Sequence, residues 1–97
     1  MPTYDTLDRF WDDYQRLGLR QKRQFVDAKN RLVEAITGRR PPPPSLRVKR
    51  VQGYPGVWEM SWASDGRATF EYGEELIPGQ AHIIWRSIGS HDIFRNP

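Results

Sequence analysis

Cysteine is absent from the 97 residues of this chain, and histidine occurs only twice. The lack of cysteine excludes a disulfide framework, a cysteine nucleophile and a thiolate metal site. Two histidines that lie apart in the sequence, with no cysteine to join them, do not form a convincing set of metal ligands. We therefore expect that the chain binds no metal and no other cofactor.

Long hydrophobic runs are absent as well. No stretch approaches the length of a membrane span, and the acidic, amphipathic N-terminus lacks the apolar core of a signal peptide. We therefore expect a cytoplasmic protein that makes no membrane contact. The length suits one domain, residues 1–97, with a modest core that needs no disulfide or metal.

Basic residues are scarce in the second half of the chain. Residues 1–50 carry twelve Lys and Arg against six Asp and Glu, a balance of +6, whereas residues 51–97 carry three against six, a balance of −3. Together they give the formal net charge of +3. A basic half is typical of a protein with a polyanionic or acidic partner, and a solvated helix face would give the same composition.

Two amphipathic helices are predicted before the middle of the chain. Apolar side chains at helical spacing predict a first helix over about residues 4–17 and a second one that ends at Gly38. Because the link between them is short, we expect a helical hairpin over about residues 4–38. A connector follows at residues 39–45, whose four prolines exclude helix and central strand and predict a stiff spacer rather than a ligand for a proline-binding module.

The pattern after the connector changes to that of strands. The expected strands are residues 46–51, 57–62, 67–72 and about 81–88. Ser64-Asp65-Gly66 suits a three-residue hairpin loop with Gly66 in the left-handed conformation. This loop predicts that Ser61 lies opposite Thr69 on the neighbouring strand.

The alternation also predicts which side chains share a face of the sheet. One face should receive both helices, with Ile83 and Trp85 joining it if the last strand points them inward. It collects the apolar side chains of Trp58, Met60, Trp62, Ala68, Phe70 and Tyr72. The other face has no helix left to cover it, so we expect an open, charged surface. Its expected members are Glu59, Arg67, Thr69 and Glu71, joined by Arg47, Lys49 and Arg86. The predicted fold class is therefore α+β, an N-terminal two-helix hairpin packed on one face of a C-terminal antiparallel sheet of residues 46–94.

Several short motifs of this half follow one another in a recognisable order. They are Leu46-Arg47-Val48-Lys49, Gly53, Gly56-Val57-Trp58-Glu59, Asp65-Gly66-Arg67-Ala68-Thr69-Phe70 and Ile88-Gly89-Ser90-His91-Asp92-Ile93-Phe94. In this order, and after a helical hairpin, they resemble the RelE/YoeB-like toxins of the RelE/ParE superfamily, from bacterial type II toxin–antitoxin systems. The resemblance covers the layout of the whole chain and specific residues from about Leu46 to Phe94.

The resemblance implies an activity and partners. It implies a toxin that enters the ribosomal A site and cuts the bound messenger RNA by general acid–base chemistry. A cognate antitoxin protein would wrap around the toxin and neutralise it, and the ribosome and the message would be its other partners. A ParE-like poison of DNA gyrase and a non-catalytic RNA- or protein-binding relative stay open as alternatives, because fold does not fix function.

Roles for individual residues also come from the resemblance. Glu59 resembles the general base, Arg67 the arginine that contacts the scissile phosphate, and His91 lies near the position of the general acid. Lys49 resembles a basic strand residue that binds or stabilises RNA. The other RNA-binding candidates are Arg47, Arg50, Arg86, Phe94 and Tyr54. The alternative interpretations are an ion pair of Glu59 with Arg67 or Arg86 and a lone surface histidine at position 91.

The chain departs from the family pattern at two places. Many relatives have an aromatic hydroxyl near the C-terminus, whereas the corresponding residue here is Phe94, which can stack but cannot transfer a proton. The first strand that usually precedes the helices should be missing or very short, because only residues 2–4 remain for it. His82 has no partner that the sequence can name.

Overall fold

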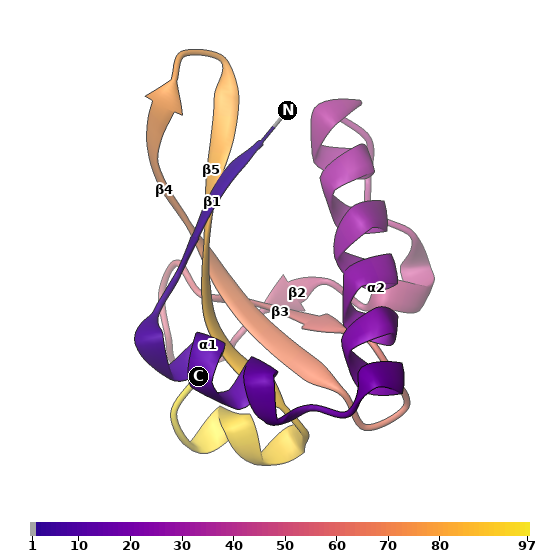
Figure 1. The fold of residues 1–97 in the computed structure, drawn as a ribbon. Helices are drawn as coiled ribbons and strands as arrows, with labels where there is room; N and C mark the ends of the chain where they lie inside the picture. The colour runs from indigo at the N-terminus through magenta and orange to yellow at the C-terminus, as the bar shows by residue number, and fades with distance from the viewer. Residues whose placement is uncertain (1) are drawn as a thin grey trace.

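Two helices and a five-stranded sheet make up the structure, a computed structural model that describes residues 2–97 (Figure 1). The elements are β1 (Thr3–Thr6), α1 (Asp8–Arg16), α2 (Leu19–Thr37), the 3-10 turn η1 (Pro44–Leu46), β2 (Lys49–Arg50), β3 (Trp58–Ser61), β4 (Arg67–Ile77), β5 (Gln80–Gly89) and the 3-10 helix η2 (His91–Arg95). The strand order is β1-β5-β4-β3-β2, with β1 parallel to β5 and the other neighbours antiparallel. The α+β class is confirmed, with a mixed rather than a purely antiparallel sheet.

The N-terminal strand corrects the sequence prediction. Apolar spacing predicted a helix from about residue 4, but β1 occupies residues 3–6 and α1 begins only at Asp8. The first strand is therefore neither missing nor cut short at residue 4. The open edge of β5 supplies the reason, because Tyr4 pairs with Ile83 and the Leu7 amide donates to the Trp85 carbonyl at 2.9 Å. A helix in this place would leave those backbone groups of β5 unpaired.

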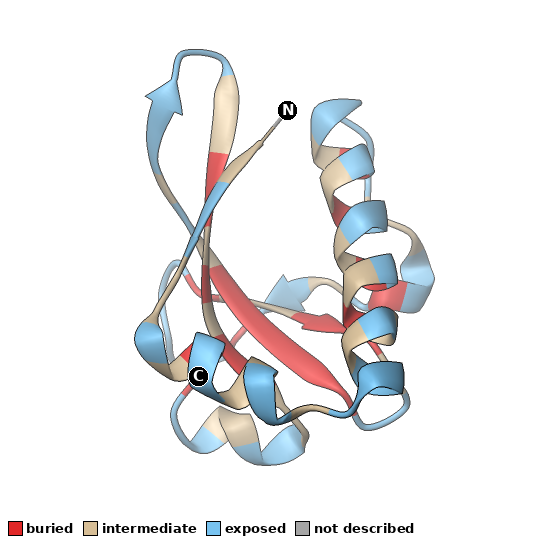
Figure 2. Cartoon of the chain, in the orientation of Figure 1, coloured by how far each residue is buried: buried red, intermediate tan, exposed pale blue. Residues whose placement is uncertain are grey.

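The core lies between the helices and one face of the sheet. Figure 2 shows the buried residues along the middle of the sheet and on the side of α2 that faces it. Met60, Ala68 and Phe70 are fully buried there, which confirms the predicted apolar face. Trp85 is the aromatic centre of this core, since its ring lies 5.1 Å from that of Phe25 and 5.3 Å from that of Phe70 between centroids. Neither helix of residues 2–97 is long and apolar enough for a bilayer crossing.

The connector and the next strand differ from the prediction. The last connector residues form η1, whose Leu46 is buried, and Arg47 then adopts a left-handed backbone with φ +48°. The alternation expected over residues 46–51 is broken there, so that β2 is only two residues long, Lys49–Arg50. The β3 edge beyond Trp58 and Glu59 is thereby left without a strand neighbour.

The hairpin between β3 and β4 is longer than predicted. Ser61 lies opposite Arg67, and Glu59 lies opposite Thr69, so the register is shifted by two residues from the expected one. The loop therefore contains five residues, 62–66. A shift of two leaves every side chain on its predicted face, because side chains alternate with a period of two.

Gly66 is needed for a different reason from the predicted one. It does not have a left-handed backbone. Instead, a Cβ atom at this position would lie only 2.6 Å from the indole ring of Trp62, which is itself 8% exposed and cannot swing into solvent. The flat indole therefore packs directly on the backbone of Gly66.

Substitution Gly66→Ala should destabilise the fold by about 1–3 kcal/mol, because the added methyl forces the packed indole and its loop to move. Urea unfolding would measure the change. Gly18→Ala is the matched control, since the added Cβ meets no atom closer than 3.9 Å and the backbone φ of −67° suits alanine. Equal losses in both variants would contradict the packing of Trp62 on Gly66.

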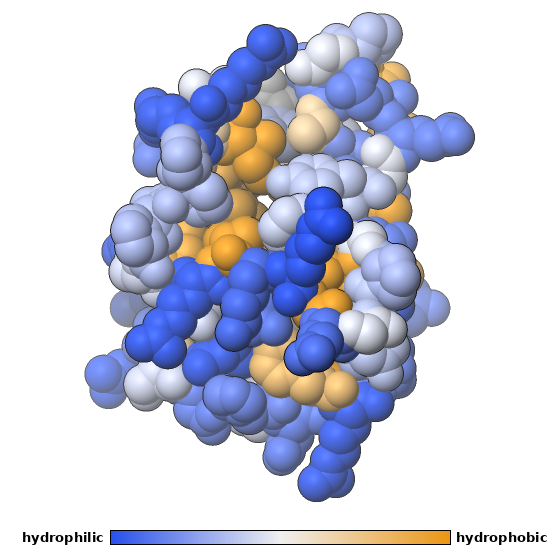
Figure 3. Space-filling model, turned by 180° about the vertical axis from the view of Figure 1, so that it is seen from behind, coloured by the Kyte–Doolittle hydropathy of each residue, from blue (hydrophilic) through white to orange (hydrophobic). Residues whose placement is uncertain are grey.

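The face of the sheet away from the core is less open than predicted. Arg67 and Thr69 are buried, and the Ser87 hydroxyl donates to the Asn96 carbonyl at 3.1 Å. The C-terminal segment thus folds back on this face. Ile83 and Trp85 do point into the core, as predicted, and a bulge in the pairing of β4 with β5 directs Arg86 outward to Glu71. Seen from behind, this side shows long hydrophilic side chains over smaller apolar patches (Figure 3).

Candidate functional site

Arg67 lies at the start of β4 and is held in place by the preceding loop. Its Nη1 donates to the carbonyl oxygens of Ala63, Ser64 and Gly66 at 3.2, 3.4 and 2.9 Å. No ion pair of Arg67 with Glu59 or Glu71 is present among residues 2–97. Neutral carbonyl groups accept from Nη1 and do not neutralise the positive charge of the guanidinium. Its Nε and Nη2 atoms form no hydrogen bond with residues 2–97.

Glu59 lies in the middle of β3, and most of its side chain is buried. Its nearest cation is Lys49 on β2, with 3.9 Å between Nζ and Oε1, and not Arg67 or Arg86 as the sequence suggested. Only 13% of the Glu59 side chain is exposed, against 70% for Lys49. Glu59 and Arg67 occupy the same face of adjacent strands at diagonal positions, which places their Cα atoms roughly 7–8 Å apart. The face thus brings together a carboxylate, an ammonium and a guanidinium group.

His91 reaches the loop that holds Arg67. Its Nδ1 lies 3.3 Å from Asp65 Oδ1, and its ring meets that of Phe94 edge-on at 5.7 Å between centroids. The Ser90 hydroxyl accepts from the amide of Asp92 and starts η2 just after β5 ends. The turn after Gly89 therefore carries the imidazole to the Asp65 side of the loop, where it is exposed to solvent.

The other RNA-binding candidates lie in different surroundings. Arg86 donates to Glu71 Oε2 at 2.7 Å and to the Pro97 carbonyl at 3.3 Å, so it fastens the C-terminal segment. Arg50 lies over the ring of Trp58, with its Cζ 5.2 Å from the centroid. Tyr54 is exposed in the turn before β3, as expected. Of these RNA-binding candidates, Arg47 is the one that lines a cavity together with Arg67.

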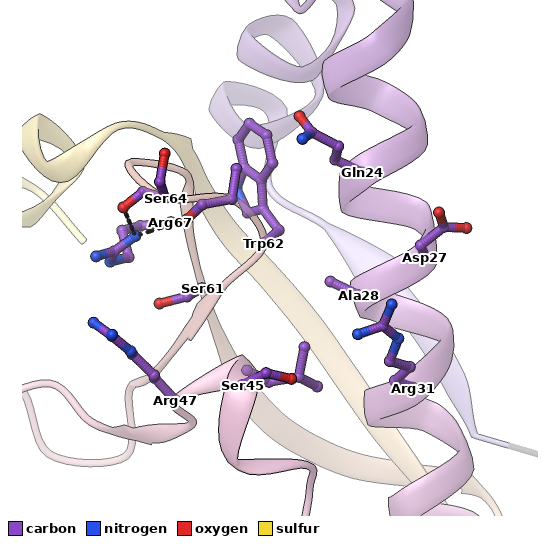
Figure 4. A pocket seen from close by; sticks show the side chains of 12 residues that line it. Gln24, Asp27, Ala28, Arg31, Ser45, Arg47, Ser61, Trp62, Ser64 and Arg67 are labelled. Atoms are coloured by element: carbon purple, nitrogen blue, oxygen red, sulfur yellow. Dashed lines mark hydrogen bonds between the residues drawn. The ribbon is translucent and has the colours of Figure 1, made fainter.

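Sequence reasoning missed the surroundings of the β3–β4 loop. Asp65, the partner of His91, was seen only as a turn residue, and nothing in the sequence links positions so far apart. Trp62 was assigned to the core face, where it is indeed buried, but it also lines a cavity of about 490 Å³ beside Arg67 (Figure 4). The signal in the sequence is a tryptophan shortly before the turn residues Ser64-Asp65-Gly66.

His82 lies outside the site and joins two strands. It is buried, with Nδ1 2.8 Å from the hydroxyl of Thr3 and Nε2 3.3 Å from Asp5 Oδ2. Both partners belong to β1, so this histidine fastens β1 to β5. In the part of the chain that the structure describes, no three His, Cys, Asp or Glu residues come together as a metal site.

The chain is similar to known proteins in fold but not in sequence. No family model matches the chain, and no curated protein is similar to it in sequence. Solved structures do match: a YoeB/ParE toxin from Agrobacterium tumefaciens superposes with a TM-score of 0.66 at 16% identity, over 92% of this chain and 98% of that one. The chain has the RelE/ParE toxin fold. The E. coli DinJ–YafQ complex gives a TM-score of 0.63 at 15% identity, over 94% and 93% of the two chains. The E. coli RelBE complex gives 0.60 at 19% identity, over 93% and 96%.

The RelE/ParE toxin fold confirms the resemblance that the ordered motifs indicated, at the level of architecture. All three neighbours are covered almost from end to end, so the helices and the whole sheet take part in the likeness. Two of them are described as toxin–antitoxin complexes. The roles of Glu59, Arg67 and His91 remain predictions for this chain, since sequence identity is below one fifth.

Proposed function

We propose that the chain is the toxin of a type II toxin–antitoxin system and an endoribonuclease that cuts messenger RNA on the ribosome. One observation supports this most strongly. Glu59, Lys49 and Arg67 share one face of the sheet, and His91 contacts the loop whose carbonyl groups hold Arg67. A carboxylate and two cations therefore share one face, and a histidine contacts the loop next to them, within the RelE/ParE toxin fold.

The geometry supports a two-proton mechanism. The Glu59 carboxylate accepts the proton of a ribose 2′-hydroxyl, whose oxygen attacks the adjacent phosphorus. Arg67 and Lys49 stabilise the additional negative charge on the phosphate oxygens. The bond from phosphorus to the 5′-oxygen breaks, and the His91 imidazolium donates a proton to that oxygen. The products are a 2′,3′-cyclic phosphate and a 5′-hydroxyl end, with every proton accounted for.

The partners follow from the same proposal. The cognate antitoxin, the ribosome and the message would meet the chain in the cytoplasm. An apolar groove of about 440 Å³ runs between β1, α1 and α2, beside exposed aromatic rings of Tyr4 and Trp11. Exposed apolar surface of this kind marks an interaction site. The basic residues of α2, Lys29 in the groove among them, suit an acidic amphipathic antitoxin segment.

Induction of the chain in bacterial cells tests the proposed function. Primer extension on a reporter message should show discrete cuts inside translated codons, because cleavage needs the ribosome to present the message. The control is the same message without its start codon, which should remain whole. Arrested growth with an intact message would point to gyrase instead, and an unaffected culture would point to a non-catalytic relative.

A further inference from the structure

The cavity beside Arg67 is strongly cationic. Three arginines from separate parts of the chain line it, namely Arg31 in α2, Arg47 after η1 and Arg67 at the start of β4. In Figure 4 the side chains of Arg47 and Arg67 lie on one side of the cavity, and Arg31 extends toward it from α2 on the other. Asp27 is the only acidic residue among the lining side chains. The cavity exists because β2 is so short that α2 and η1, rather than another strand, face the end of β3.

Several side chains that line this cavity have polar groups without a partner among residues 2–97. No carboxylate of residues 2–97 forms an ion pair with Arg31 or Arg47. The indole Nε1 of Trp62 is buried and has no hydrogen-bond partner within the described part of the chain. Buried donors without a partner are uncommon, because desolvation of the N–H group costs free energy. Three serines, at positions 45, 61 and 64, also line the cavity.

We propose that this cavity binds a phosphate-bearing nucleotide of the RNA strand, next to the bond that is cut. This inference rests on the proposed function and adds a place for the neighbouring nucleotide. Guanidinium groups bind phosphate through paired hydrogen bonds, which a single lysine cannot do. A volume of about 490 Å³ lies in the range of small-ligand sites.

The cavity is connected to the proposed cleavage site on two sides. Arg67 belongs to both, so a phosphate held by Arg47 and Arg67 would lie next to the charged patch with Glu59. A second cavity of about 440 Å³ lies on the other side of the loop and shares Trp62 and Ser64 with the first. It extends to Ser90, directly before His91. A single strand can therefore run along α2 past the loop.

Binding of 5′-AMP to the ¹⁵N-labelled full chain tests the inference. The indole N–H signal of Trp62, assigned by its loss in Trp62→Phe, should shift and saturate as 5′-AMP is added. Arg31→Gln should weaken the affinity by about tenfold, the effect of losing one charge-assisted hydrogen bond. Arg23→Gln removes the same charge from the same helix, but Arg23 is exposed and lines neither of the two cavities, so this variant should bind as the wild type does.

Three results would overturn the proposal. The first is a Trp62 signal that does not shift at 5′-AMP concentrations of about 10 mM, which exceed the dissociation constant expected even of a weak specific site. The second is equal weakening by Arg31→Gln and Arg23→Gln, which would show general attraction to a basic helix. The third is adenosine binding as tightly as 5′-AMP, which would exclude phosphate recognition. Because the titration needs no ribosome, saturable binding without message cleavage would reject the proposed function and retain the site.

Discussion

Substitution Arg67→Ala should lower the rate of message cleavage by about 10²–10³-fold, the usual effect of removing a preorganised group that stabilises transition-state charge. The three loop carbonyls hold Arg67 Nη1 and leave the remaining guanidinium nitrogens for a phosphate. A cationic side chain that the loop did not hold in place would have to lose conformational entropy before it could bind the phosphate in the same way. The measurement is the single-turnover cleavage rate on purified ribosomes that carry a defined message.

Arg67 also contributes to the fold, so the loss of rate needs controls. Its removal leaves three carbonyl groups with one donor fewer, and the free energy of unfolding should fall by about 1–3 kcal/mol. Circular dichroism during urea unfolding shows whether the variant is folded at the assay temperature. Arg16→Ala deletes the same charge from an exposed position in α1, where the side chain pairs only with Asp13, and should cleave normally. A folded Arg67→Ala chain with full activity would remove Arg67 from the mechanism.

Substitution Trp85→Ala should cost about 3–5 kcal/mol of stability, the range for deleting a large buried aromatic side chain. Trp85 is 3% exposed and lies between three other rings, those of Phe10, Phe25 and Phe70. These rings belong to α1, α2 and β4, so the cavity left by the substitution would open where three elements meet. The midpoint and slope of urea unfolding give the free energy.

Trp11→Ala is the matched comparison, because it deletes the same side chain from a half-exposed position. Trp11 is 49% exposed and stacks on Tyr14 at 5.7 Å between centroids. The expected loss is less than about 1.5 kcal/mol. Similar losses in the two variants would mean that Trp85 is not the centre of the core, and that helix packing rather than the inner face of the sheet determines stability.

The sequence predicted those parts of the fold that depend on local periodicity. The period of two put Met60 and Phe70 on the inner face, although the register of their strands was wrong by two residues. The end of α2 was also predicted to within a residue. In contrast, Tyr4 and Leu7 satisfy the spacing of a helix, and only the edge of β5, almost the whole chain away, makes a strand of residues 3–6.

The candidate site follows the same division. Alternation along β3 and β4 placed Glu59 and Arg67 on one face, and the structure agrees. The partners of these residues depend on loops and ends that no periodicity describes. The five-residue loop turns its carbonyls toward Arg67, the contact between Asp65 and His91 spans 26 residues, and Arg86 is occupied by the folded-back C-terminal segment. Such contacts form only in three dimensions, and they decide which charges are available.

The pairing of β1 with β5 determines when folding of the sheet can be completed during synthesis. Thr3 and His82, which join β1 to β5, are 79 residues apart. During synthesis a chain emerges from its N-terminus at about 5–20 residues per second, so β1 waits for seconds with no strand to pair with. Contacts of such long range also close slowly, because loop entropy must be overcome first. The sheet can therefore be completed only after β5 has also left the ribosome, so β1 is the first of the five strands to emerge and the last to pair.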